Sequence, residues 1–183
     1  AVGDAIGLAT EFLDKDTAFC YYGISHFNYE HYYFDRHRMK WMDKNYICND
    51  WTDDTDQMLL ILDSLISHNG NVNIIDFAKR CKYWINCGFS ECGDLMPCGV
   101  GANFGKVVDD KDFIENPVAV SEKIWKNNNC QNASNGSVMR TSVVVLFYFW
   151  DIKKVIENAK LFSLCTHADP RCTASVVTVV NII

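Results

Sequence analysis

Residues 51–67 read Trp-Thr-Asp-Asp-Thr-Asp-Gln-Met-Leu-Leu-Ile-Leu-Asp-Ser-Leu-Ile-Ser. Apolar side chains recur at positions 58, 61, 62, 65 and 66, which is the spacing of one face of an α-helix. Leu59 and Leu60 widen that face, and Gly70 supplies a stop signal. The stretch therefore predicts a long, largely buried helix, around which the rest of the chain has to pack.

Two adjacent carboxylates, Asp53 and Asp54, open this helix between the hydroxyls of Thr52 and Thr55. Hard oxygen ligands of this kind suit Mg²⁺, Mn²⁺ and Ca²⁺, and the free N–H groups of a helix N-terminus can hold carboxylates in place. Thr and Asp are also ordinary residues at a helix N-cap and in the first turn. The residues alone leave helix capping and metal binding open.

Two further helices are expected, over residues 74–86 and from Pro117 to about residue 126. The apolar segments 142–150 and 174–180 are β-branched or aromatic, so propensity favours strands. A helix buried on all sides fits them equally well, because periodicity does not separate the two for short apolar runs.

The composition predicts one globular domain over residues 1–183. The chain is 49% hydrophobic and has no internal repeat and no linker, while 22% charged and 13% aromatic residues exclude a disordered chain. A net charge of −6 gives no general attraction for nucleic acid or anionic membranes. No window approaches the roughly 18 apolar residues of a membrane span, so we expect neither kind of partner.

Nine cysteines in a chain without a signal peptide favour free thiols in a reducing, cytoplasmic compartment. The series Cys81, Cys87, Cys92 and Cys98 contains no Cys-x-x-Cys pair, so buried thiols are favoured over a zinc site. Serine hydrolases with a Gly-x-Ser-x-Gly motif and zincins with His-Glu-x-x-His are excluded, since neither motif occurs.

Three loops carry further candidate residues. Gly99 and Gly101 lie in a small-residue loop that could cradle phosphate with its N–H groups or be an ordinary turn. Residues 132–140, Asn-Ala-Ser-Asn-Gly-Ser-Val-Met-Arg, are either a polar nest facing a ligand or a loop that enters a helix at Ser137. His167, before a Pro-stopped turn, could be a ligand, a base or a buried hydrogen-bond partner.

In their order and spacing these motifs resemble the ADP-ribosylglycohydrolases, the family that includes the dinitrogenase reductase-activating glycohydrolase. The resemblance runs along the whole chain. The matching segments are Gly3-Asp4-Ala5-Ile6-Gly7 with Glu11-Phe12, Thr52-Asp53-Asp54-Thr55, Gly99-Val100-Gly101, Ser134 to Arg140, and Thr166-His167.

The resemblance implies an all-α fold, a compact orthogonal helical bundle in which the two ambiguous segments are buried helices. It also implies two Mg²⁺ or Mn²⁺ ions with Thr52, Asp53 and Asp54 as ligands. Glu11 would lie beside the ions and contact or gate the substrate, so Asp53, Asp54 and Glu11 form the expected catalytic set. The residues expected along the diphosphate and ribose path are Gly99, Gly101, Ser134, Asn135, Gly136 and Ser137, with His167 at the distal end.

The activity implied is metal-dependent hydrolysis at the anomeric carbon of the ribose, releasing ADP-ribose from an ADP-ribosylated protein or small molecule. The alternative is a non-catalytic ADP-ribose-binding or crystallin-like structural protein on the same fold. The oligomeric state, the modified residue and the preferred ion stay open.

The family completes its metal site with a late Asp-x-Asp-Thr motif that does not occur here, and residues 109–112 do not match it. The chain begins at Ala1 and stops within the apolar run Ser-Val-Val-Thr-Val-Val-Asn-Ile-Ile. We therefore expect a fragment truncated at the C-terminus that holds half of the ion ligands and is inactive on its own.

Overall fold

A computed structural model describes residues 1–8, 10–23, 51–94 and 96–183. Its α-helices are α1 (Val2–Gly7), α2 (Lys15–Tyr22), α4 (Asp53–Ser67), α5 (Ile74–Cys87), α6 (Ala102–Asp109), α7 (Pro117–Asn127), α8 (Ile152–Leu164) and α9 (Pro170–Ile182). Three 3₁₀ helices join them: η1 (Ser90–Cys92), η2 (Asn135–Ser137) and η3 (Thr141–Phe147). These ranges contain no strand, and the predicted all-α fold is confirmed.

The three helices predicted from apolar spacing form where expected. Thr52 caps α4, and the N–H of Gly70 donates to the carbonyl of Leu65 to close its end, with Gly70 at φ 81°. The side chain of Asn73 caps α5, and Pro117 stands in the first turn of α7. Local capping and periodicity are therefore sufficient to locate these helices.

The segment 142–150 is neither a strand nor a fully buried α-helix. Most of it forms η3, in which Val143 and Val144 are buried while Leu146 is 63% exposed. The expectation of a helix buried on all sides is wrong here, because the short 3₁₀ helix packs against α4, α8 and α9 on only part of its surface.

The segment 174–180 lies within α9, which is α-helical and amphipathic. Cys172, Val176 and Val180 are buried at four-residue spacing, whereas Ala174 and Ser175 are exposed. The burial of one face against α8 and η3 outweighs the β propensity of the valines. The helical alternative is correct for this segment, although one face lies at the surface.

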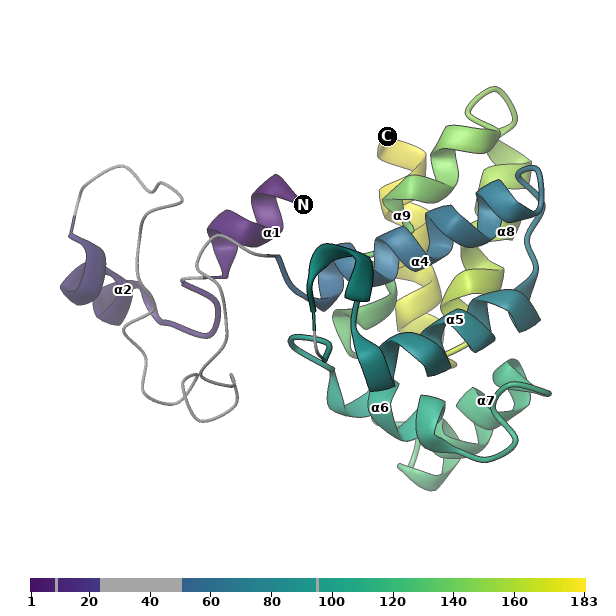
Figure 1. The fold of residues 1–183 in the computed structure, drawn as a ribbon, viewed down its shortest axis with the longest axis horizontal. Coiled ribbons are helices and arrows are strands. Elements are labelled where there is room, and N and C mark those ends of the chain that lie inside the picture. Colours follow the sequence, from purple (N-terminus) through teal and green to yellow (C-terminus); the bar gives the residue numbers. More distant parts are fainter. Residues whose placement is uncertain (9, 24–50, 95) are drawn as a thin grey trace.

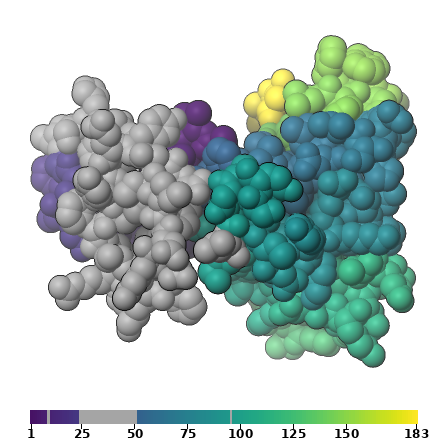
Figure 2. Space-filling view, in the orientation of Figure 1, coloured from purple at the N-terminus to yellow at the C-terminus, as the bar shows by residue number. Residues whose placement is uncertain are grey.

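The core lies where α4, α5, α8 and α9 meet. In Figure 1, α4 and α5 run along the long axis of the view and α9 runs steeply across it. Phe77 of α5 meets Phe162 of α8 edge to face, with ring centroids 5.1 Å apart. Figure 2 shows the segment around residue 150, in light green, at the surface at the same end as the yellow C-terminal turn of α9.

The buried thiols belong to Cys81, Cys165 and Cys172. Cys92 is exposed, so the expectation that the whole series from Cys81 to Cys98 is buried was wrong. Among the described residues, no helix is both long enough and apolar enough to cross a membrane.

Candidate functional site

The N-terminus of α4 is held by a carboxylate from α1. Asp4 Oδ2 accepts hydrogen bonds from the backbone N–H groups of Thr52 and Thr55, at 3.0 and 3.1 Å. Its two oxygens also accept the hydroxyls of the same threonines, at 2.8 and 2.7 Å. Asp4 therefore connects α1 to the acidic motif, about fifty residues further along the chain. Asp4 was recognised in the sequence only as part of the family's opening motif, and no such role was predicted for it.

The side chains that cap α4 are different from the two adjacent carboxylates, Asp53 and Asp54. Thr52 is the N-cap and accepts the N–H of Asp54 at 3.4 Å, while Asp4 accepts the N–H groups of Thr52 and Thr55. Within the described residues, neither Asp53 nor Asp54 accepts a hydrogen bond from the α4 backbone. Capping thus accounts for Thr52 but gives no reason for the paired aspartates.

Negative charge accumulates around these aspartates. Burial, followed by repulsion from Asp54, Glu11 and Asp4, raises the pKa of Asp53 to about 8. Burial and repulsion from Asp4 and Glu11 raise the pKa of Asp54 to about 6. A cation at this place would relieve the repulsion, since a bound ion is the largest local charge in such a site.

The described residues supply the donors for such a cation but not a finished coordination shell. In residues 1–8, 10–23, 51–94 and 96–183, no three His, Cys, Asp or Glu side chains are grouped to hold a metal ion. The donor chemistry, carboxylates with threonine hydroxyls, fits Mg²⁺ or Mn²⁺. The assignment of Thr52, Asp53 and Asp54 as ligands stays a prediction.

The glycine loop lies directly against the acidic motif. Gly99 has φ 77°, and a Cβ added to it would lie 2.9 Å from Asp53 Oδ1 and 3.7 Å from Thr52 Cβ. A side chain at residue 99 would therefore collide with Asp53. Gly101 is the N-cap of α6 and offers no side chain to its first N–H groups. Gly99 thus lies beside the carboxylate of Asp53, and the phosphate-binding role of the loop stays a prediction.

A second cluster forms around His167, which is 2% exposed. Ser134 Oγ lies 2.9 Å from His167 Nε2, and a Cβ on Gly136 would lie at the same distance from that nitrogen. Burial, together with the charge of Arg140, lowers the pKa of His167 to about 3, so the ring is neutral at physiological pH. The loop predicted as a polar nest therefore packs on this histidine.

Arg140 connects this cluster to the acidic motif. Its Nη1 donates to Gln57 Oε1 at 2.6 Å, and Gln57 Nε2 donates to Asp53 Oδ2 at 3.1 Å. Its Nη2 donates to Thr166 Oγ1 at 2.6 Å, and that oxygen lies 2.8 Å from His167 Nδ1. An unbroken path of hydrogen bonds runs from Asp53 to His167.

The start of α6 joins the same assembly through amides. Asn103 Nδ2 donates to the carbonyl of Thr166 at 3.0 Å, and Asn132 Nδ2 donates to Asn103 Oδ1 at 2.6 Å. Residues from the glycine loop, the 132–140 loop and the Thr166-His167 segment thereby contact one another. No site role was predicted for the side chains of Gln57, Asn103 or Thr166, because each of them has a partner, Arg140 or Asn132, that is distant in the chain.

The candidate residues divide into two groups. One group surrounds the acidic motif at the start of α4 and consists of Thr52, Asp53, Asp54, Glu11 and Gly99. The other group surrounds His167 and includes Ser134 and Gly136. Gly101 and Asn135 are exposed, whereas Ser137 is completely buried. No contact with a substrate is present to test these roles, and they stay predictions.

A family model described as ADP-ribosylglycohydrolase matches residues 1–183. Neither the curated proteins nor the solved structures that were searched contain a match to the chain.

Proposed function

Because the chain belongs to the ADP-ribosylglycohydrolase family, we propose that it is a metal-dependent hydrolase that releases ADP-ribose from ADP-ribosylated protein side chains. The observation that carries the proposal is the crowding of the buried Asp53 by Asp54, Glu11 and Asp4; burial first, and then this repulsion, raise the pKa of Asp53 to about 8. Charge repulsion of this kind costs stability, and it is expected where carboxylates serve a cation or a reaction.

In this proposal Thr52, Asp53 and Asp54 hold Mg²⁺ or Mn²⁺, two ions by analogy with the family. When bound, the ions supply the positive charge that orients the ribose and activates a nucleophile. Cleavage at the anomeric carbon develops oxocarbenium character, which nearby carboxylates stabilise. Glu11, exposed beside the aspartates, would contact the substrate there.

The diphosphate needs different neighbours, because the carboxylates repel it. The backbone N–H groups after Gly99 and Gly101 are neutral donors at the N-terminus of α6, where an anion is favoured. Ser134, Gly136 and His167 would shape the distal ribose or base end. The buried thiols Cys81, Cys165 and Cys172 fit the proposed reducing, cytoplasmic location.

The test is release of ADP-ribose from ADP-ribosylated protein by the full-length protein, with Mg²⁺ and with a chelator. We expect release that the chelator stops and that Asp53→Asn abolishes. Asp63→Asn is the matched control, because Asp63 lies on the same helix with its side chain 49% exposed and 3.9 Å from Arg80.

Release that survives both the chelator and Asp53→Asn would overturn the metal assignment. A folded protein that releases nothing from arginine-linked or serine-linked substrates would instead be the binding or structural protein of the alternative hypothesis.

A further inference from the structure

Arg140 is completely buried and touches no carboxylate within the described residues. Its guanidinium carbon lies 5.2 Å from the ring centre of Phe77 and 5.7 Å from that of Phe104. The two rings and three oxygen acceptors hold the cation in place. A guanidinium has hydrogen-bond donors only, so every group that forms a hydrogen bond with it has to supply the acceptor atom.

That constraint fixes the amide of Gln57. Arg140 Nη1 is 2.6 Å from one terminal atom of this side chain, which must therefore be the oxygen. The other terminal atom is then the nitrogen, and it faces Asp53 Oδ2 at 3.1 Å. Gln57 is itself completely buried, so water does not compete for either contact.

The same constraint acts on His167 through Thr166. Arg140 Nη2 donates to Thr166 Oγ1 and occupies one of its lone pairs, which leaves the hydroxyl proton of Thr166 available to donate to His167 Nδ1, 2.8 Å away. A neutral imidazole with an acceptor at Nδ1 carries its proton on Nε2. That proton faces Ser134 Oγ at 2.9 Å.

We propose that Arg140 is a positioning residue that sets the direction of the hydrogen bonds at both ends of the site. Through Gln57 it presents an N–H to Asp53, and through Thr166 it places the proton of His167 on Nε2. The effect on catalysis rests on the proposed function, whereas the protonation of His167 does not.

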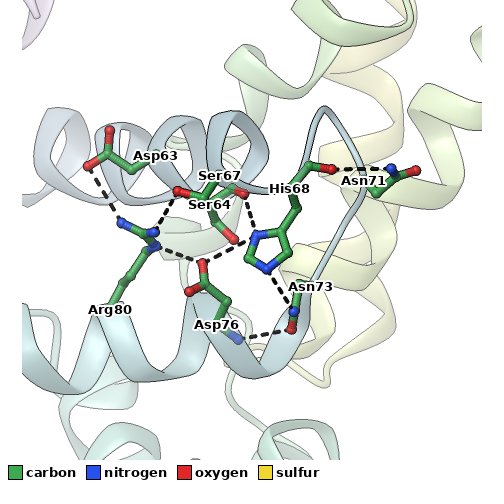
Figure 3. A network of polar contacts seen from close by, with 8 residues as sticks. All are labelled: Asp63, Ser64, Ser67, His68, Asn71, Asn73, Asp76 and Arg80. Carbon is green, nitrogen blue, oxygen red and sulfur yellow. Dashed lines mark hydrogen bonds and ion pairs between the residues drawn. The ribbon is translucent and has the colours of Figure 1, made fainter.

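His68 provides an internal reference for this proposal. Its Nδ1 lies 2.9 Å from the carbonyl of Ser64, and its Nε2 lies 3.0 Å from the amide nitrogen of Asn73 (Figure 3). A carbonyl only accepts and an amide nitrogen only donates, so neutral His68 carries its proton on Nδ1. The two histidines should thus be opposite tautomers.

Long-range ¹H–¹⁵N NMR at about pH 8, where an ordinary imidazole is neutral, distinguishes these tautomers. We expect the Nε2–H form for His167 and the Nδ1–H form for His68. Thr166→Val should abolish the preference of His167 and leave His68 unchanged, while Thr166→Ser should keep it. Ser163→Ala is the matched control, because it removes a buried hydroxyl from α8, three residues before Thr166, that has no hydrogen-bond partner among the described residues.

The Nδ1–H form for His167, or an unchanged preference in Thr166→Val, would overturn the proposal whether or not the protein is a hydrolase. In the active enzyme we expect Gln57→Leu to lower kcat by about 10- to 100-fold with little change in KM. Thr166→Val should mainly raise KM. Equal effects of both variants on kcat and KM would indicate a structural role only.

Discussion

Two arginines organise the polar interactions of the helical body, and their surroundings are opposite. Arg140 is completely buried and donates to Gln57, Thr166 and the carbonyl of Phe162. Arg80 has a side chain that is 28% exposed and reaches Asp76 at 2.7 Å and Asp63 at 3.9 Å. Figure 3 shows this second network between α4 and α5, with Ser67, His68 and Asn73 around it.

The comparison indicates that burial, more than the number of contacts, decides how much an arginine contributes to the free energy of unfolding. Removal of Arg80 leaves groups that water can reach and solvate again. Removal of Arg140 leaves acceptors that water cannot reach, and each keeps its cost of desolvation. The Arg80 network is therefore dispensable, whereas the Arg140 network is a condition for the fold and for the geometry of the candidate site.

The largest effect is expected from Arg140→Met. The acceptors of Gln57, Thr166 and Phe162 lose their donor in a buried site, and the free energy of unfolding should fall by about 3–5 kcal/mol. Urea unfolding followed by circular dichroism measures the loss. A loss no larger than that of Arg80→Ala would contradict the importance given to burial.

Asp53→Asn should change the free energy of unfolding in the opposite direction and stabilise the protein. The folded-state pKa is raised to about 8, so the carboxyl favours folding when protonated, and this contribution is lost as the pH rises from about 4 through 8. In the presence of a chelator, the variant should be more stable than the wild type by about 2 kcal/mol at pH 7. Thermal unfolding at pH 5, 7 and 9 checks this, and a wild-type stability that does not fall over this range would refute it.

Asp169 provides an intermediate case, because its side chain is 2% exposed while that of its partner Arg171 is 63% exposed. It caps α9 and accepts the indole N–H of Trp125 at 3.0 Å. Asp169→Ala should cost about 1 kcal/mol, as is usual for the loss of an N-cap. Chemical unfolding of both proteins at pH 7 measures this difference.

The charge of Asp169 is tested separately by pH. Its hydrogen bonds with Arg171 hold the pKa well below the ordinary range, so the stabilisation is present above about pH 4 and is lost as the pH falls through the folded pKa. Asp169→Asn keeps an acceptor for the cap and should lose less stability on acidification than the wild type. Equal acid sensitivity would show that the charge contributes nothing.

The smallest effect is expected from Arg80→Ala. The ion pairs of Arg80 are partly exposed, and pairs that water reaches contribute about 0.2–1 kcal/mol, which salt screens. Urea unfolding at low salt and in about 1 M NaCl should show a small difference that shrinks with salt. A large difference independent of salt would place Arg80 in the same class as Arg140.

The sequence was informative wherever one helix could be judged alone. The apolar spacing after Trp51 and over residues 74–86, together with Pro117 at a first helical turn, predicted α4, α5 and α7 close to their observed bounds. It was uninformative for residues 142–150, because whether they form η3 depends on the surfaces of α4, α8 and α9 against which they pack. Propensity alone favoured a strand there.

The site divides in the same way. The motif residues Asp53, Gly99 and His167 were recognisable from their order and spacing, since each motif is a local pattern. Gln57 was not, because nothing in the local sequence distinguishes a glutamine that meets Arg140, 83 residues away, from one that faces water.

By itself, the sequence determined the helical class, the positions of the most regular helices and the family to which the chain belongs. Only the tertiary structure decided that Asp4 accepts hydrogen bonds from the N-terminus of α4 and that Arg140 links Asp53 to His167 through Gln57 and Thr166. The physical reason is the distance along the chain over which each interaction acts. Periodicity and capping act within a few residues, whereas a buried donor finds its acceptor only after helices far apart in the chain have packed together.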